Sequence, residues 1–459
     1  MEYQEFLKNK SFLDVPTGFD VDDINPQLFP FQADIVRWAL RRGRAAIFAD
    51  CGLGKTPMQL EWASHIHKHT KAPVIILAPL AVSEQTKREG NKFGVKVRLC
   101  ESQKDVVNGV NITNYEKLSK FRVSEFAGVV LDESSIIKNF TGSLRNEIID
   151  AFAKTPYRLA CTATPAPNDY MELGNHAEFV GAMTRSEMLS MFFINDASDT
   201  GTWILKGHAQ SSAFWQWLCS WAVMISKPSD LDYPDDGFTL PELTYHEHII
   251  KSSAESTGFF TDEVSGMNDR RHVRSETVEI RCKKAAEIIN STDDKWIAWC
   301  GLNTESAILT ELIHDAIEIT GSQTNEIKAK LMLDFAEGTI DRVVTKPKIA
   351  GRGMNWQICN NMVFVGMNDS WEDLYQAIRR IYRFGQEKPV NVHIIIEERE
   401  GSVLSNIKRK DAQAKEMMRQ MIKYTQDTMK AELGQLHKSI TDYVPTKTME
   451  VPKWLKSEC

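Results

Sequence analysis

"AIFADCGLGKTPMQL", residues 46–60, carries the strongest structural signal in this chain. A short apolar run ends at Asp50, and a glycine-rich loop around Leu53 then leads through Lys55 and Thr56 into a segment of helical character. A buried strand followed at once by a tight loop and a helix is a building unit of parallel α/β proteins. The stretch therefore predicts one such unit, whose loop either holds a phosphate group or only turns the chain.

The loop matches the phosphate-binding pattern G-x-x-x-x-G-K-[ST] except at its first position, which is Ala49. Gly52 and Gly54 let the backbone curl so that successive N–H groups point at a phosphate. The N-terminal end of the following helix adds partial positive charge at the same place. Lys55 offers a mobile cation to the β- and γ-phosphates, and Thr56 offers a hydroxyl to Mg²⁺. We therefore predict that the loop binds a nucleotide.

An acidic segment provides the metal-binding half that such a loop requires. In GVVLDESSIIKN, residues 128–139, an apolar run is followed by Asp132 and Glu133. We expect Asp132 to hold Mg²⁺ and Glu133 to orient and deprotonate the attacking water. A solvated strand end is the alternative, but adjacent carboxylates after a buried strand are the expected partners of Lys55.

Positive charge for the transition state is expected from LYQAIRRIYRFGQEKP, residues 374–389. This segment carries Arg379, Arg380 and Arg383, and the last two lie three residues apart, so on a helix they share one face. If that face lines a cleft opposite the phosphate loop, both guanidinium groups can neutralise the transferring phosphoryl group. The alternative is a basic helix that faces solvent.

Strand-length apolar runs occur in two separate blocks, with helix-like segments between them. The runs are rich in valine, isoleucine and leucine without clear alternation, which is typical of parallel strands buried on both faces. The first block contains 45–50, 72–79, 110–115, 127–133 and 157–164, and the second contains 295–301, 341–347, 361–367 and 390–396. We predict an α/β protein with two parallel-sheet lobes.

Residues 175–280 interrupt this alternation of strand-length runs and helix-like segments. Four of the eleven tryptophans fall within 203–221, and turn-rich and polar segments follow. We expect a helical insertion with a small core of its own and then a flexible linker. The tryptophans could instead form a base-stacking platform. Apolar side chains at helical spacing in 402–433 predict a C-terminal amphipathic helix packed on the second lobe.

Composition limits the classes of protein that fit. No apolar run approaches the roughly 20 residues needed to cross a bilayer, and the N-terminal segment lacks the pattern of a signal peptide. The eight cysteines form no CxxC pair, so we expect reduced core residues in a cytoplasmic protein rather than a zinc site. The net charge of −7 argues weakly against nucleic acid, although local basic patches decide such binding.

With these segments in order, the chain resembles the superfamily-two ATPases and, among them, the Swi/Snf-type DNA translocases. The likeness covers most of residues 28–400 and rests on many short motifs in one order. They are LFPFQ (28–32), AxxGxGKT (49–56), VIILAPLAVSEQTKRE (74–89), ITNYEKL (112–118), DESSIIKN (132–139), LACTATPAPN (159–168), ITGSQTNEIKAKLMLDF (319–335), TKPKIAGRGMNWQ (345–357) and YQAIRRIYRFGQ (375–386). The glycine and glutamine that end the last motif distinguish this branch from strand-separating relatives.

The resemblance implies further roles. Gln32 would contact adenine, and Leu53 and Gly353 would join the loop glycines in binding the nucleotide. Five residues would couple the ATP site to the nucleic acid or contact the nucleic acid: Lys138, Thr162, Thr164, Lys346 and Gln376. Ser135 departs from the family pattern, because a histidine is usual there, so the coupling of hydrolysis to movement is expected to differ in detail.

The resemblance implies two RecA-like lobes with a helical insertion and a C-terminal helix. The expected units are an N-terminal extension (1–23), lobe 1 (24–175), the insertion and linker (176–280), lobe 2 (281–400) and a helical tail (401–459). It also implies an ATP- and Mg²⁺-dependent motor that translocates on or remodels double-stranded DNA. The alternatives are a strand-separating DNA or RNA helicase of superfamily two and an ATP-gated nucleic-acid clamp without significant turnover. We expect a monomeric, minimal member of the bacterial or phage kind, with a nuclease or a replication or recombination protein as candidate partner.

Overall fold

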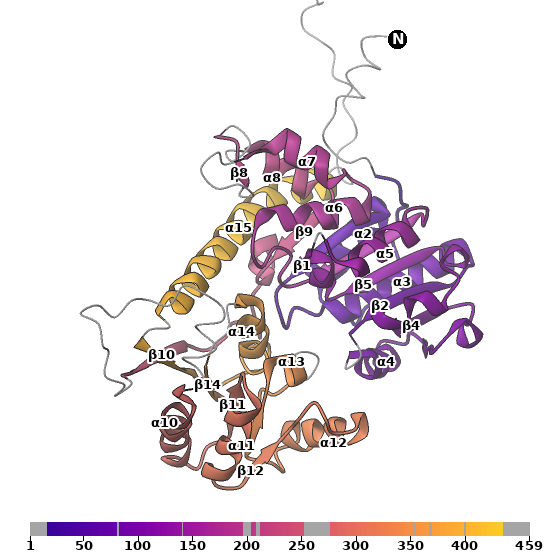
Figure 1. The fold of residues 1–459 in the computed structure, drawn as a ribbon. Coiled ribbons are helices and arrows are strands. Elements are labelled where there is room, and N and C mark those ends of the chain that lie inside the picture. The colour runs from indigo at the N-terminus through magenta and orange to yellow at the C-terminus, as the bar shows by residue number, and fades with distance from the viewer. Residues whose placement is uncertain are drawn as a thin grey trace, which may run out of the picture.

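The structure is a computed structural model that describes residues 16–79, 82–139, 141–195, 203–207, 212–251, 276–351, 355–366, 370–398 and 401–434. Two parallel β-sheets with helices packed on them form two lobes (Figure 1). The predicted class, α/β with two parallel-sheet lobes, is confirmed. Among the described helices, none is both long and apolar enough to span a bilayer.

The sheet of lobe 1 has seven parallel strands in the order β3-β4-β2-β5-β6-β1-β9. All five predicted runs of the first block are strands. Their residues are buried almost throughout, as expected for a sheet covered on both faces. The strands are β1 (Arg44–Ala49), β2 (Val74–Ala78), β3 (Val97–Leu99), β4 (Val110–Asn114), β5 (Gly128–Asp132), β6 (Tyr157–Thr162) and β9 (Ala222–Ile225).

The sheet of lobe 2 has six parallel strands in the order β10-β15-β14-β11-β13-β12. The four predicted runs of the second block are strands, whereas the edge strands β10 and β12 were not predicted. The strands are β10 (Leu243–Ile250), β11 (Trp296–Cys300), β12 (Ala316–Glu318), β13 (Arg342–Thr345), β14 (Asn361–Val365) and β15 (Val390–Glu397).

Helices connect the strands in both lobes and cover the sheets (Figure 1). Lobe 1 includes α2 (Pro30–Arg42), α3 (Lys55–Thr70), α4 (Ser83–Lys92), α5 (Ser143–Phe152), α6 (Leu173–Val180), α7 (Arg185–Phe192) and α8 (Phe214–Cys219). Lobe 2 includes α10 (Val278–Asn290), α11 (Asn303–Leu312), α12 (Asn325–Ala336), α13 (Pro347–Ala350) and α14 (Trp371–Ile378). A short antiparallel hairpin of β7 (Phe193–Asn195) and β8 (Trp203–Leu205) lies beside α7 and α8.

The tryptophan-rich segment is part of the core of lobe 1, so the prediction of a separate small core was wrong. Trp217 and Trp221 are fully buried and belong to the same apolar cluster as Phe48 of β1 and Leu131 of β5. Large aromatic rings bury much apolar area, which favours packing against the existing sheet over a second, smaller core. Their burial also excludes a base-stacking platform at these two positions.

The segment between the two blocks contributes one strand to each sheet. β9 pairs with β1 in lobe 1, and β10 pairs with β15 in lobe 2. Residues 252–275, part of the predicted linker, lie outside the described residues. The segment that connects the two lobes is therefore anchored in both sheets, by β9 in lobe 1 and by β10 in lobe 2.

The C-terminal helix α15 (Gly401–Gly434) spans both lobes, whereas we predicted packing on lobe 2 alone. Near its start, Leu404 and Ile407 join the core of lobe 2, and further along, Met417 and Met421 join the core of lobe 1. With 34 residues it extends about 50 Å, long enough to cross from one lobe to the other. Figure 1 shows it running from the region of β10 to α8.

Candidate active site

The phosphate loop follows β1 and ends where α3 begins at Lys55. Gly52 and Gly54 have φ values of 91° and 78°, a backbone region that glycine enters without steric cost. A Cβ added at Gly52 would lie 2.8 Å from the backbone nitrogen of Phe384 in lobe 2. The loop therefore needs glycine both for its curl and for the close approach of the second lobe.

One cavity of about 150 Å³ brings together residues that lie far apart in the sequence. From lobe 1 it is lined by the phosphate loop, the acidic pair and α4, and from lobe 2 by α14 and the arginine segment. The lining residues are Cys51, Gly52, Gly54, Lys55, Thr56, Pro57, Val82, Gln85, Glu89, Asp132, Glu133, Asn355, Gln376, Arg379, Arg380 and Arg383. Most predicted catalytic and nucleotide-binding residues thus surround a single space.

The ammonium group of Lys55 is held by the loop itself. Its Nζ donates to the backbone oxygens of Ala49, at 2.9 Å, and Asp50, at 3.5 Å. Burial opposes its charge, but the neighbouring groups of Cys51 and Glu133 outweigh this effect, so the pKa of Lys55 is raised. Among the described residues, the hydrogen bonds of this ammonium go to neutral carbonyl oxygens, so its charge is available to an anionic ligand.

The acidic pair stands at the end of β5, opposite the start of α3. Asp132 accepts a hydrogen bond from Nε2 of Gln59 at 2.7 Å. Burial and the adjacent charge of Glu133 raise the pKa of Asp132 to about 6. Glu133 has a left-handed backbone, with φ of 53°, and its buried Oε2 has no hydrogen-bond partner within the described part of the chain. A buried acceptor without a partner is costly unless a ligand or water satisfies it.

The arginine segment reaches the same cavity from lobe 2. Arg380 and Arg383 both line it, and only 5% of Arg380 is exposed. The buried Nε of Arg383 has no hydrogen-bond partner among the described residues. Both side chains therefore line the cavity beside the phosphate loop, and the alternative of a solvated basic helix does not hold for them. The prediction of a shared helical face was wrong, because α14 ends at Ile378 and both arginines lie in the turns that follow it.

Arg379 plays a different part, which was not predicted. Its Nη2 lies 2.6 Å from Oδ2 of Asp50, and the hydroxyl of Tyr375 donates to Oδ1 of the same carboxylate. Burial opposes the charge on Arg379, but the Asp50 carboxylate together with Tyr375 and Cys51 outweighs burial and raises the pKa of the guanidinium. This cluster joins the first residue after β1 to α14 across the lobe boundary.

A second carboxylate also joins the two lobes: Glu372 of lobe 2 contacts residues of lobe 1. Oε1 accepts hydrogen bonds from Ser135, at 2.6 Å, and from Thr164, at 3.5 Å. Oε2 pairs with the ammonium of Lys138. Lys138, expected as a phosphate contact, therefore binds a lobe-2 carboxylate in this arrangement. Thr162 lies beneath, where its hydroxyl accepts from the backbone N–H of Thr164 at 3.1 Å.

Gln32 stabilises the phosphate loop by a hydrogen bond. Its Nε2 donates to the backbone oxygen of Leu53 at 2.9 Å, and its Oε1 accepts from the N–H of Phe29 at 3.0 Å. Gln32 is 4% exposed and lies behind Gly54, so the predicted contact with adenine stays a prediction. Gln376, which we assigned to nucleic-acid coupling, lines the cavity itself.

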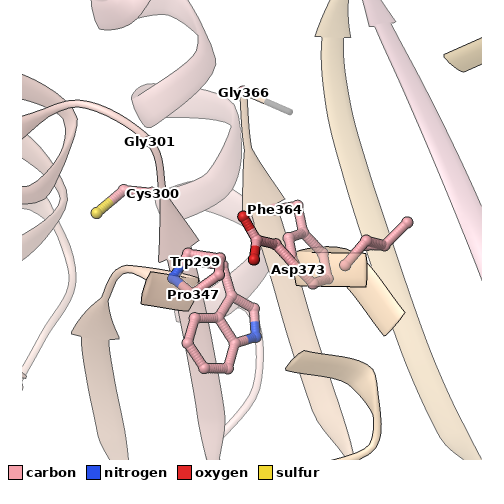
Figure 2. A pocket seen from close by; sticks show the side chains of 8 residues that line it. Trp299, Cys300, Gly301, Pro347, Phe364, Gly366 and Asp373 are labelled. Carbon is pink, nitrogen blue, oxygen red and sulfur yellow. The ribbon is translucent and has the colours of Figure 1, made fainter. Parts of the chain in front are cut away.

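Lys346 does not reach this cavity, and Gly353 lies outside the described residues. Nζ of Lys346 donates to Oδ1 of Asn303 at 2.5 Å, at the carboxyl edge of the lobe-2 sheet. A small cavity of about 30 Å³ lies near this edge, where Asp373 projects between Trp299 and Phe364 (Figure 2). This volume holds about one water molecule, whereas the cavity between the lobes, at about 150 Å³, has room for a nucleotide phosphate chain.

Several lining residues were missed by sequence reasoning. They reach the cavity from the phosphate loop, from α4 and the loop before it, and from lobe 2, and they are Cys51, Val82, Gln85, Glu89 and Asn355. They carry no catalytic residue pattern of their own, and only their nearness to recognisable motifs in the chain could have suggested them.

Comparison with known proteins gives two family matches in succession. The SNF2-related domain matches residues 31–184, and the helicase conserved C-terminal domain matches residues 281–385. Chromodomain-helicase-DNA-binding protein 1-like of Danio rerio is 21% identical over 80% of this chain and 41% of its own length. DNA annealing helicase and endonuclease ZRANB3 of Bos taurus is 21% identical over 82% of this chain and 39% of its own.

The chain thus spans about two fifths of the length of these relatives. Among solved structures, the Sulfolobus solfataricus SWI2/SNF2 ATPase core in complex with dsDNA is 18% identical with a TM-score of 0.43, covering 93% of this chain and all of that one. The two matched domains lie in the order that the motifs predict, one on each lobe. The chain belongs to the Swi/Snf-type ATPases of helicase superfamily two.

Proposed function

We propose that this protein is an ATP-dependent motor that uses hydrolysis to translocate on or remodel double-stranded DNA. The observation that carries the proposal is the cavity between the lobes. It is lined by the phosphate loop and acidic pair of lobe 1 and by Arg380 and Arg383 of lobe 2. Because both lobes contribute to one site, a change in the ligand's charge can change how the lobes fit together.

The residues of the cavity fit ATP and Mg²⁺. The curled loop, the start of α3 and Lys55 form an anion site, and the unsatisfied Oε2 of Glu133 marks a place for a hydrogen-bond donor. Thr56 and Asp132 would hold Mg²⁺, whose charge would neutralise phosphate oxygens during transfer.

The side chains then divide the work of hydrolysis. Lys55 binds the phosphate chain, and Glu133 orients the attacking water and accepts its proton. Arg380 and Arg383 stabilise the charge on the transferring group and do so only when lobe 2 is docked. Loss of the γ-phosphate removes the anion that these arginines face, so the lobes separate more easily after hydrolysis.

Double-stranded DNA is the track that we propose. The supporting observations are the motif ending in Gly385–Gln386 and the DNA-related names of the relatives, a helicase-DNA-binding protein and a DNA annealing helicase. Sequence-independent grip would come from phosphate contacts, for which Lys346 and the backbone near Gly351 are candidates. Binding should then weaken with salt, with a log–log slope of about −0.9 for each duplex phosphate contacted.

An ATPase assay with duplex DNA, single-stranded DNA and RNA tests this function. We expect stimulation by duplex DNA that is lost in Lys55→Ala and Glu133→Gln. Lys68→Ala on the exposed side of α3 and Glu116→Gln serve as matched controls that retain it. Equal or greater stimulation by RNA would favour the strand-separating helicase. Tight DNA binding with negligible turnover would favour the ATP-gated clamp.

We further propose a cytoplasmic, monomeric enzyme. The seven described cysteines are all free thiols and six of them are buried, which suits a reducing compartment. Because the complete nucleotide cavity is formed by one chain, catalysis does not call for a second copy. Light scattering with and without duplex DNA measures the oligomeric state.

A further inference from the structure

We propose that Glu372 is a positioning residue that links the acidic motif of lobe 1 to the arginine segment of lobe 2. Through this link it sets how strongly nucleic acid stimulates hydrolysis. The inference rests on the proposed function, because it assigns a coupling role within that motor. It concerns a residue that does not line the nucleotide cavity and that no motif singled out.

The contacts of Glu372 converge from three separate positions on lobe 1. Ser135 and Lys138 belong to the segment that follows Asp132 and Glu133, and Thr164 follows β6. Two hydroxyls and one ammonium donate to a single carboxylate that is 2% exposed. A buried carboxylate is stable only when it is paired and hydrogen-bonded, so this arrangement requires the lobes to be docked.

The position of Glu372 on α14 connects it to the arginines. Gln376, one helical turn later, lines the cavity, and the chain continues through tight turns to Arg380 and Arg383. The N–H of Arg380 donates to the backbone oxygen of Ala377 at 3.2 Å, which fixes the start of that turn. A shift of Glu372 against lobe 1 therefore moves the arginines against the phosphate loop.

Ser135 places one end of the link close to the proposed base. Its short hydroxyl is 1% exposed and donates to Glu372 at 2.6 Å. Its backbone lies two residues after Glu133, the proposed base. The Glu372 carboxylate thus contacts the segment next to the proposed base, and the turns that follow its helix carry Arg380 and Arg383.

The ion pair with Glu372 also limits which other anions Lys138 can bind. In the docked state its ammonium neutralises Glu372, and the Lys138 side chain is 30% exposed. When the lobes separate, this charge becomes available to a phosphate of the track. DNA contact and lobe docking would therefore compete for one ammonium, which provides a route by which the track changes the rate of hydrolysis.

The test compares Glu372→Gln, Lys138→Met and the charge reversal Lys138→Glu/Glu372→Lys with the unaltered chain. We expect Glu372→Gln to lower DNA-stimulated kcat about tenfold and to change KM for ATP by less than about twofold. Lys138→Glu and Glu372→Lys are also made singly, and the reversed pair should regain part of the stimulation that each of these single variants loses. Glu387→Gln, an exposed carboxylate just beyond the arginine segment, is the matched control.

A second readout is independent of hydrolysis. Amide hydrogen exchange of residues 132–139 and 371–378 in the nucleotide-free protein should rise in Glu372→Gln and stay unchanged in Glu387→Gln. If Glu372→Gln does not fold, Ser135→Ala replaces it, because it removes one donor and leaves the carboxylate paired with Lys138.

Two results would overturn the inference: unchanged stimulation together with unchanged exchange, or a loss of ATP affinity as large as the loss of kcat. Absence of DNA stimulation in the unaltered chain would instead refute the proposed function. The exchange experiment would then still decide whether Glu372 holds the lobes together.

Discussion

The two halves of the nucleotide cavity are positioned by different means. In lobe 1, the phosphate loop follows directly from β1 to α3, and Lys55 is held by the backbone of Ala49 six residues earlier. In lobe 2, the cavity residues come from α14 and its following turn. They are fixed by contacts such as that between Tyr375 and Asp50, which are 325 residues apart in the sequence.

This difference separates binding from turnover. The phosphate loop of lobe 1 is built from neighbouring residues, and lobe 1 itself holds Lys55 in place. The lobe-2 residues are positioned by tertiary contacts, among them those with the carboxylate of Asp50 and those of the Glu372 carboxylate. We therefore expect substitutions in lobe 1 to weaken ATP binding and those in lobe 2 to slow hydrolysis of ATP that is already bound.

The largest effect is expected for Arg383→Ala. Removal of a guanidinium that acts only on the transition state should lower kcat about 1000-fold and leave the ATP dissociation constant nearly unchanged. Single-turnover hydrolysis and binding of a fluorescent nucleotide measure the two quantities. Lys388→Ala, an exposed cation nearby, is the control. Equal losses of binding and rate would show that lobe 2 contributes to binding as well.

The second-largest effect is expected for Asp50→Asn, which tests whether the contact between the lobes depends on the buried Asp50–Arg379 ion pair. Asp50→Asn leaves Arg379, whose side chain is 16% exposed, without its carboxylate. Breaking one side of such a pair should cost about 3 kcal/mol. Denaturant unfolding, followed by tryptophan fluorescence, measures the loss.

Glu101→Gln is the control for this loss of charge. It removes the carboxylate of a surface pair with Lys117, in which the Glu101 side chain is 78% exposed, and should cost less than about 1 kcal/mol. If the two variants lose the same stability, the Asp50 cluster does not hold the lobes together.

The contrast between local structure and tertiary contacts also explains which features could be predicted from the sequence. Nine strands, the phosphate loop and the acidic pair were predictable, because each depends on a run of neighbouring residues with a strong local pattern. Arg380 and Arg383 were predicted to face the loop from one face of a helix. Both line the cavity, but they lie in the turns after α14, which ends at Ile378, so the spacing argument was wrong although the residues were the right ones.

The partners of Asp50 and Glu372 could not be predicted in the same way. An acidic side chain gives no local sign of which cation or hydroxyl it meets across a lobe boundary. The tryptophan-rich segment was misjudged for a related reason: its apolar pattern shows that Trp217 is buried but not against which sheet. The reach of α15 over both lobes depends on where the lobes lie in space, which helical periodicity does not encode.

A smaller effect is expected where the two halves touch. Gly52→Ala places a methyl group 2.8 Å from the backbone nitrogen of Phe384 and also strains a residue with φ of 91°. We expect about 2 kcal/mol of strain and a roughly tenfold lower kcat, because the arginine turn must move away. Gly94→Ala is a matched control, since its φ of 74° brings similar strain but its Cβ would meet nothing within 4 Å. Equal activity of both variants would mean that the approach of Phe384 is not needed.

The smallest effect concerns the pH dependence of the lobe-1 half. Burial raises the pKa of Asp132 to about 6, and a protonated Asp132 cannot hold Mg²⁺, so kcat/KM should fall about twofold at pH 6 and about tenfold by pH 5. Because the raised pKa favours the protonated folded form, this group stabilises the fold below its unfolded pKa of about 3.9, and that contribution is lost as the pH rises through about 6. Gln59→Met removes a hydrogen bond that lowers this pKa and should move the acid limb to higher pH. An acid limb centred near pH 4 in the unaltered chain, or one that Gln59→Met leaves in place, would show that Asp132 does not control it.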